Sequence, residues 1–184
     1  MKLVFLLEEQ SMKELLDGLM PRMFPGVEYM AIPHSGKSDL EKSIPRKLRA
    51  WQDPQARFVI VRDQDSADCK VVKAHLRELC NQSGKSDCLI RISCRELESW
   101  FLGDLQAVET AMRVRNLKKQ QNSRKYRNPD KLSSPSDELR KLVPLYQKIS
   151  GARAIGAELR EEGNRSQSYN IFLSGIRKLI GISP

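Results

Sequence analysis

Long apolar runs are missing from this sequence. The run from Leu3 to Leu7 is stopped at once by Glu8 and Glu9, so it is shorter than the core of a signal peptide. Nothing approaches the roughly 20 apolar residues of a transmembrane helix. We therefore expect a cytoplasmic protein with no membrane segment.

Paired cysteines are missing as well. None of the four cysteines, Cys69, Cys80, Cys88 and Cys94, stands in a Cys-x-x-Cys arrangement. Cys80 and Cys94 lie in apolar patterns. This usage predicts reduced core thiols in a cytoplasmic protein rather than disulfides or a zinc site.

A complete phosphate-binding P-loop is also absent, although Gly36-Lys37-Ser38 and Gly84-Lys85-Ser86 imitate its end. The motif needs a glycine five residues before the Gly-Lys pair, and those positions hold Ala31 and Leu79. An ATPase is therefore not expected. Lys37 could still contact a phosphate as a point charge.

Acidic residues are outnumbered, with 23 Asp and Glu against 32 Lys and Arg and a formal net charge of +9. The basic residues cluster between Arg113 and Arg127, where no acid occurs. One interpretation is a solvated loop. The other is contact with nucleic-acid phosphates, with Tyr126 as a stacking surface. The candidate phosphate-binding residues are Lys118, Lys119, Arg124 and Lys125, together with Arg165 before the last helix.

The apolar run Val59 to Val61 ends in clustered acids, Asp63, Asp65 and Asp68. Side chains two apart on an extended segment face the same side, so Asp63 and Asp65 should lie close together and repel. A hard cation such as Mg²⁺ or Mn²⁺ reverses that repulsion and prefers oxygen ligands. The alternative is that Asp63 ends the strand while Asp65 or Ser66 caps the next helix.

A second strand tip, Leu3 to Leu7, ends in Glu8 and Glu9, and helical patterns follow both tips. If the two strands are neighbours, Glu8 would converge with the aspartates outside the carboxyl ends of the sheet. Glu96 and Glu98 follow a further strand and would face the same side of an extended segment. Glu98 is the candidate ligand for a second metal ion, and a solvated turn is the alternative.

Strand and helix patterns alternate through residues 1–94, which predicts an α/β fold with a parallel or mixed sheet flanked by helices. Capping boxes are expected at Ser11 and Ser38, and Pro45 is expected to kink or divide a helix over 38–51. Helical patterns dominate after residue 95. We expect an α/β core over 1–105 and a helical C-terminal portion over 106–184, which carries a basic loop at 113–128 and packs on the core.

Leu7-Glu8 before a helix, and a strand ending in Asp63-x-Asp65, resemble the Toprim domain of topoisomerases, primases and OLD-family nucleases. Segments 6–12, 34–37, 62–69, 95–104 and 164–166 look like a Toprim-related bacterial family of unknown function. The resemblance implies a Rossmann-like core, with Glu8 as general acid or base and the two aspartates as magnesium ligands. Toprim proteins commonly have glycine after the glutamate, where this chain has Glu9.

The resulting expectation is metal-dependent phosphodiester hydrolysis, as in a nuclease. Glu8 and Lys37 would be the catalytic residues, and Glu8, Asp63, Asp65, Asp68 and Glu98 the metal ligands. The alternative is a nucleic-acid-binding or regulatory subunit with a vestigial metal site, which works with a protein encoded by a neighbouring gene. The oligomeric state and the choice between DNA, RNA and nucleotide stay open.

Overall fold

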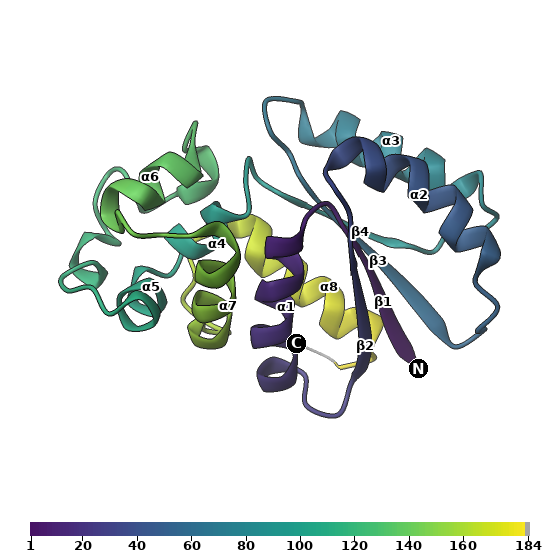
Figure 1. The fold of residues 1–184 in the computed structure, drawn as a ribbon, viewed down its shortest axis with the longest axis horizontal. Helices are drawn as coiled ribbons and strands as arrows, with labels where there is room; N and C mark the ends of the chain where they lie inside the picture. The colour runs from purple at the N-terminus through teal and green to yellow at the C-terminus, as the bar shows by residue number, and fades with distance from the viewer. Residues whose placement is uncertain (183–184) are drawn as a thin grey trace.

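The computed structural model describes residues 1–182 and places a four-stranded parallel sheet at the centre of the fold (Figure 1). The strand order is β2-β1-β3-β4. The strands are β1 (Lys2–Leu7), β2 (Glu28–Pro33), β3 (Ala56–Asp63) and β4 (Leu89–Ser93). The predicted α/β class with a helix-flanked sheet is thereby confirmed, and the sheet is parallel throughout.

Eight α-helices are assigned within residues 1–182. They are α1 (Gln10–Met23), α2 (Lys37–Ala50), α3 (Cys69–Asn81), α4 (Glu98–Leu102), α5 (Leu105–Met112), α6 (Pro135–Leu142), α7 (Lys148–Glu158) and α8 (Gln167–Leu179). Two short 3-10 turns, η1 (Lys118–Gln120) and η2 (Pro129–Lys131), lie between α5 and α6. None of the helices in this range is long and apolar enough to cross a membrane.

Both faces of the sheet are buried, which explains why its central strands are nearly continuous apolar runs. In β1, Leu3 and Phe5 belong to one hydrophobic cluster, whereas Val4 and Leu6 belong to another. Helices α2 and α3 cover the second face, and α1 and α8 lie on the first (Figure 1). The alternation of side chains along each strand thus supplies two cores.

The C-terminal helices extend the first of these cores. Helix α7 packs along α1, and α8 packs beside β4. The α1–α7 approach is close, because a methyl group on Gly156 would lie 2.6 Å from the carbonyl oxygen of Leu15. Residues before and after position 105 therefore contribute to a single cluster of buried side chains.

Helix α2 runs on past Pro45, so of the two expected effects of this proline, a kink or a division, the division does not occur. The two expected capping boxes were wrong. Neither capping box forms, since the N-cap positions are Glu9 and Gly36. Both helices begin before the serines expected as caps, and both glutamates have other partners: Glu14 pairs with Arg153, and Glu41 accepts a hydrogen bond of 2.5 Å from Arg62.

A buried carboxylate ties the C-terminal helices together. Asp104 is fully buried and caps α5 through Ala107 N–H at 3.2 Å. Its Oδ2 accepts the backbone N–H of Arg160 at 3.0 Å, and the Arg160 guanidinium donates to both carboxylate oxygens. Asp104 therefore joins the start of α5 to the segment after α7.

Replacing Asp104 by alanine should lower the free energy of unfolding by about 3 kcal/mol, because several buried donors lose their acceptor together. Asp137→Ala is the matched control, since the Asp137–Arg140 pair is exposed and its loss should cost less than about 1 kcal/mol. Urea unfolding of both variants measures the difference. Equal losses would mean that Asp104 contributes no more than a surface ion pair.

Candidate acidic site at the carboxyl edge of the sheet

Parallel pairing brings two acidic strand ends together. Strands β1 and β3 are neighbours, and Leu7 is in register with Val61. Glu8 follows β1, while Asp63 is the last residue of β3. The backbone N–H of Asp63 donates to Glu8 Oε2 at 3.0 Å. The convergence expected of Glu8 and Asp63 therefore exists in the fold.

Glu8 is half-buried and lies beside the buried guanidinium of Arg62. Arg62 Nε is 3.8 Å from Glu8 Oε2. Burial raises the pKa of Glu8, the hydrogen bond from Asp63 N–H opposes this, and the charge of Asp65 raises it further. The net pKa lies above the ordinary value for glutamate, which suits a group that must exchange a proton.

Asp63 is a buried acid of this edge, with 5% of its surface exposed. The Ser93 hydroxyl, at the end of β4, donates to its Oδ1. Burial raises the pKa of Asp63 well above its ordinary value, and the charges of Glu8, Glu9 and Glu98 raise it further. A carboxylate in this state gains from a nearby cation.

Asp65 is placed by a turn, not by an extended strand. Strand β3 ends at Asp63, and Asp65 has a left-handed φ of 56°. Its N–H donates to the carbonyl of Arg95 at 2.8 Å, and its carboxylate lies 3.3 Å from Lys37 Nζ. The premise that Asp63 and Asp65 share one side of an extended segment was wrong, because the chain turns between them.

Asp68 is a helix cap. Its Oδ1 accepts the N–H groups of Lys70 at 2.8 Å and Val71 at 3.2 Å, at the start of α3. A cap for this helix was expected at Asp65 or Ser66, and that position was wrong, because α3 begins after Asp68. Both N–H groups would otherwise lack a helical partner.

Glu96 and Glu98 do not share a face of an extended segment. Glu98 begins α4 and is fully buried, and Tyr146 Oη donates to its Oε1 at 3.1 Å. Its Oε2 has no hydrogen-bond partner, and burial raises the pKa of Glu98. Glu96 Oε2 instead accepts the N–H of Ser136 at 2.7 Å, so it caps the start of α6, where the Ser134 side chain makes no cap hydrogen bond.

A lysine from α7 enters the acidic edge. Lys148 Nζ donates to Glu9 Oε2 at 2.7 Å. Burial lowers the pKa of Lys148, but Glu9, Glu98 and Asp63 raise it, and the net pKa is raised. Sequence reasoning missed this residue because α7 begins more than 80 positions after the acidic strand tips, and only tertiary packing brings it here.

The oxygen donors fit a hard divalent cation, although no three His, Cys, Asp or Glu side chains within residues 1–182 form a ready metal cluster. Mg²⁺ needs only one or two carboxylates because it keeps several waters. Glu8 accepts the backbone N–H of Asp63, so two carboxylate-bearing residues meet at this edge. The buried, unpartnered Oε2 of Glu98 is a further oxygen without a donor.

A family model described as a domain of unknown function, DUF4276, matches residues 7–177. The chain belongs to the DUF4276 family. The matched range runs from the end of β1 into α8, so it includes the whole acidic edge and Lys148. No curated protein and no solved structure matches the chain.

The other predicted phosphate contacts of this DUF4276 chain are spread over its C-terminal portion. Lys118 and Lys119 belong to the exposed turn η1. Lys125 forms an ion pair with Glu138, and Arg165 donates to Asn122 Oδ1 at 3.0 Å. Arg124 lines a hollow described below.

Tyr126 does not offer an exposed stacking surface. Only 5% of its surface is exposed, and it belongs to the main hydrophobic cluster. The stacking interpretation was therefore wrong. An aromatic residue inside a basic segment anchors that segment to the core.

Replacing Asp63 by asparagine should stabilise the metal-free DUF4276 chain at neutral pH. The folded state raises the pKa of Asp63, so ionised Asp63 opposes folding once the pH exceeds its ordinary value of 3.8. The gain should grow as the pH rises from that value to the folded pKa, and stay constant above it. Urea unfolding over a pH series measures this.

Asp65→Asn is the control for that experiment, because Asp65 is partly exposed beside Lys37. It should show no comparable pH-dependent gain. If Asp63→Asn instead lost stability at every pH, the hydrogen bond with Ser93 would outweigh the cost of the buried charge. Asp63 would then be a structural acceptor.

Proposed function

We propose that this protein hydrolyses phosphodiester bonds of nucleic acid, with Mg²⁺ or Mn²⁺ held by Glu8 and Asp63 and with Asp65 at the rim. The observation that carries the proposal is the meeting of Glu8 with Asp63 at the carboxyl edge of a parallel sheet, where ligands of open α/β folds bind. The raised pKa of Asp63 supports a role in cation binding.

The resemblance to Toprim domains supports the same assignment. It relates Glu8 to a general acid or base and Asp63 and Asp65 to magnesium ligands. The parallel order, with β1 beside β3, puts these motifs on adjacent strands. Glu98 is the candidate for a second ion, because its buried Oε2 lacks a partner.

Glu8 is positioned to move a proton. Both its hydrogen bond from Asp63 N–H and its contact with Arg62 use Oε2, so Oε1 is the atom that would accept a proton from the attacking water. When bound, the divalent ion would stabilise charge on the phosphate and lower the pKa of a bound water. Burial shifts the pKa of Glu8 upward, in the direction of neutral pH, which favours proton transfer by this group.

Two lysines would orient the phosphate. Lys37 lies at the rim, where 58% of its side chain is exposed beside Asp65. Lys148 lies inside the cluster and is held by Glu9. Each can place a positive charge near a phosphate oxygen without coordinating a metal.

Glu8→Gln should reduce Mn²⁺-dependent cleavage of nucleic acid by about 10² to 10⁴-fold, because the amide cannot accept a proton at neutral pH. Metal should still bind through Asp63, as measured by calorimetry with Mn²⁺. Glu28→Gln is the matched control, since Glu28 is exposed at the start of β2, at the opposite edge of the sheet. It should leave cleavage unchanged.

The second candidate function is a nucleic-acid-binding or regulatory subunit whose metal site is vestigial, working with a separately encoded protein. The Lys148–Glu9 pair favours it, because an ammonium group already neutralises part of the acidic cluster. Calorimetry that detects no Mg²⁺ or Mn²⁺ at millimolar concentration would support this function. Intact DNA, RNA and nucleotides in the presence of bound Mn²⁺ would also reject the hydrolase.

A further inference from the structure

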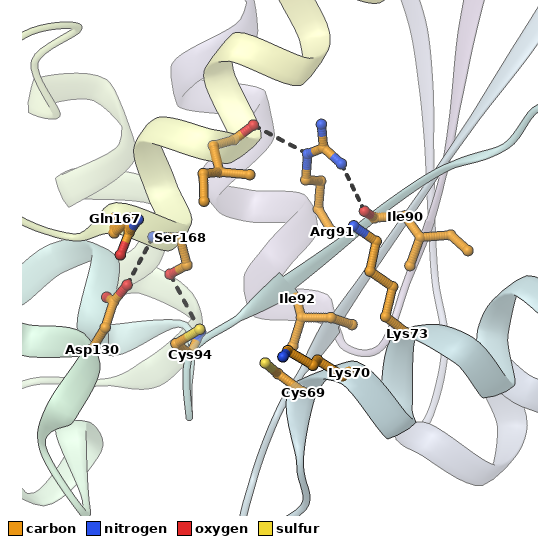
Figure 2. A pocket seen from close by; sticks show the side chains of 11 residues that line it. Cys69, Lys70, Lys73, Ile90, Arg91, Ile92, Cys94, Asp130, Gln167 and Ser168 are labelled. Carbon is orange, nitrogen blue, oxygen red and sulfur yellow. Dashed lines mark hydrogen bonds between the residues drawn. The ribbon is translucent and has the colours of Figure 1, made fainter.

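The outer edge of β4 borders a basic hollow of about 340 Å³ (Figure 2). Lys70 and Lys73 enter it from α3, and Arg91 enters it from β4. Arg91 is fixed, because its Nε donates to the Ile171 carbonyl at 3.1 Å and its Nη1 to the Ile90 carbonyl at 2.9 Å. The two lysine ammonium groups have no hydrogen bond or ion pair to any residue of the described range 1–182.

Across this hollow lie the start of α8 and the turn η2 (Figure 2). The only acid in the lining is Asp130. Its two oxygens already accept hydrogen bonds from Ser166 Oγ at 2.6 Å and Ser168 N–H at 2.7 Å. The single carboxylate of the hollow therefore serves the α8 start rather than the lysines.

A second hollow, of about 550 Å³, lies on the basic loop. Its cationic lining residues are Arg124, Lys125, Arg127 and Lys131, and no carboxylate lines it. Lys125 pairs with Glu138, while the other three side chains have no hydrogen bond or ion pair within residues 1–182. Like charges gathered around a cavity repel unless an anion enters it.

The two hollows meet at η2. Asp130 lines the first hollow and its neighbour Lys131 lines the second. Consecutive Cα atoms are about 3.8 Å apart, so the two hollows share η2 as a border. Cations of α3 and β4 line the hollow on one residue of this turn, and cations of the basic loop line the hollow on the next residue.

The loop that carries the second hollow is braced. Gln121 Oε1 accepts the N–H of Leu105 at 2.7 Å, and its Nε2 donates to the carbonyls of Leu102 at 3.0 Å and Tyr126 at 3.1 Å. Tyr126 and Pro129 are buried. The exposed arginines and lysines of this loop therefore project from a fixed backbone, which lowers the entropic cost of binding an extended anion.

We propose that the two hollows form one track that binds the phosphate backbone of a nucleic-acid strand over η2. The cations that line both hollows, the absence of a carboxylate from the described lining of the second hollow and the engagement of Asp130 fit a sequence-independent polyanion contact. The choice of nucleic acid as the polyanion rests on the proposed function. Lys118 and Lys119, although on the same loop, line neither hollow and lie outside the track.

Fluorescence anisotropy of a labelled oligonucleotide in EDTA, over a salt series, tests the track without any hydrolysis. Arg124, Arg127 and Lys131 changed together to Gln should weaken binding about 10-fold or more and lower the log-log salt slope by about 2 to 3. The double variant Lys70→Gln with Lys73→Gln should lower the log-log salt slope by about 2. The matched control is Lys42, Arg46 and Arg49 changed to Gln, which removes three exposed charges of α2 and should leave the slope unchanged.

An equal loss in the control triple would show that net charge alone attracts the strand, and would overturn the track. So would unchanged binding in both hollow variants, or binding competed by pyrophosphate but not by unlabelled oligonucleotide. Melting curves confirm that each variant is folded. If the hollow variants lose binding while wild-type protein never cleaves, the track stands and the hydrolase fails. If cleavage persists with an unchanged KM in these variants, the hydrolase stands and the track fails.

Discussion

The candidate site depends on the parallel pairing of β1 with β3. The two strands are in register from Lys2–Ala56 to Leu7–Val61, so the segments that follow β1 and β3 leave the sheet at the same edge. This pairing lets the backbone N–H of Asp63 reach Glu8 at 3.0 Å. The apolar alternation that buries both faces of the sheet fixes the register, since a slip by one residue would send every side chain of a strand to the opposite face.

Two acids of this edge have a cationic side chain beside them. Arg62 stands beside Glu8, and Lys148 stands beside Glu9. Asp63 receives only the hydroxyl of Ser93, which leaves its pKa well above the ordinary value. The least compensated acid is therefore also among the most buried, and it is where an added cation would lower the free energy most.

Several residues of the segments that resemble Toprim-related proteins, 95–104 and 164–166, make packing contacts and lie outside the acidic site. Asn164 donates to the Trp100 carbonyl at 2.9 Å, and Gly103 leaves no room for a side chain against Asn164. Ser166 caps α8 through Tyr169 N–H. These contacts lock α4 to the start of α8, so a motif in a sequence can mark packing as readily as chemistry.

The sequence by itself determined the alternation of strands and helices, the buried strands and the acids at two strand ends, because these follow from local periodicity. Only the tertiary structure decided which acids meet. Asp63 joins Glu8, Asp65 turns toward Lys37, and Asp68 caps α3. It also decided that α7 brings Lys148 to the site. Such pairings depend on strand order and on helix packing across long separations, and no local pattern encodes them.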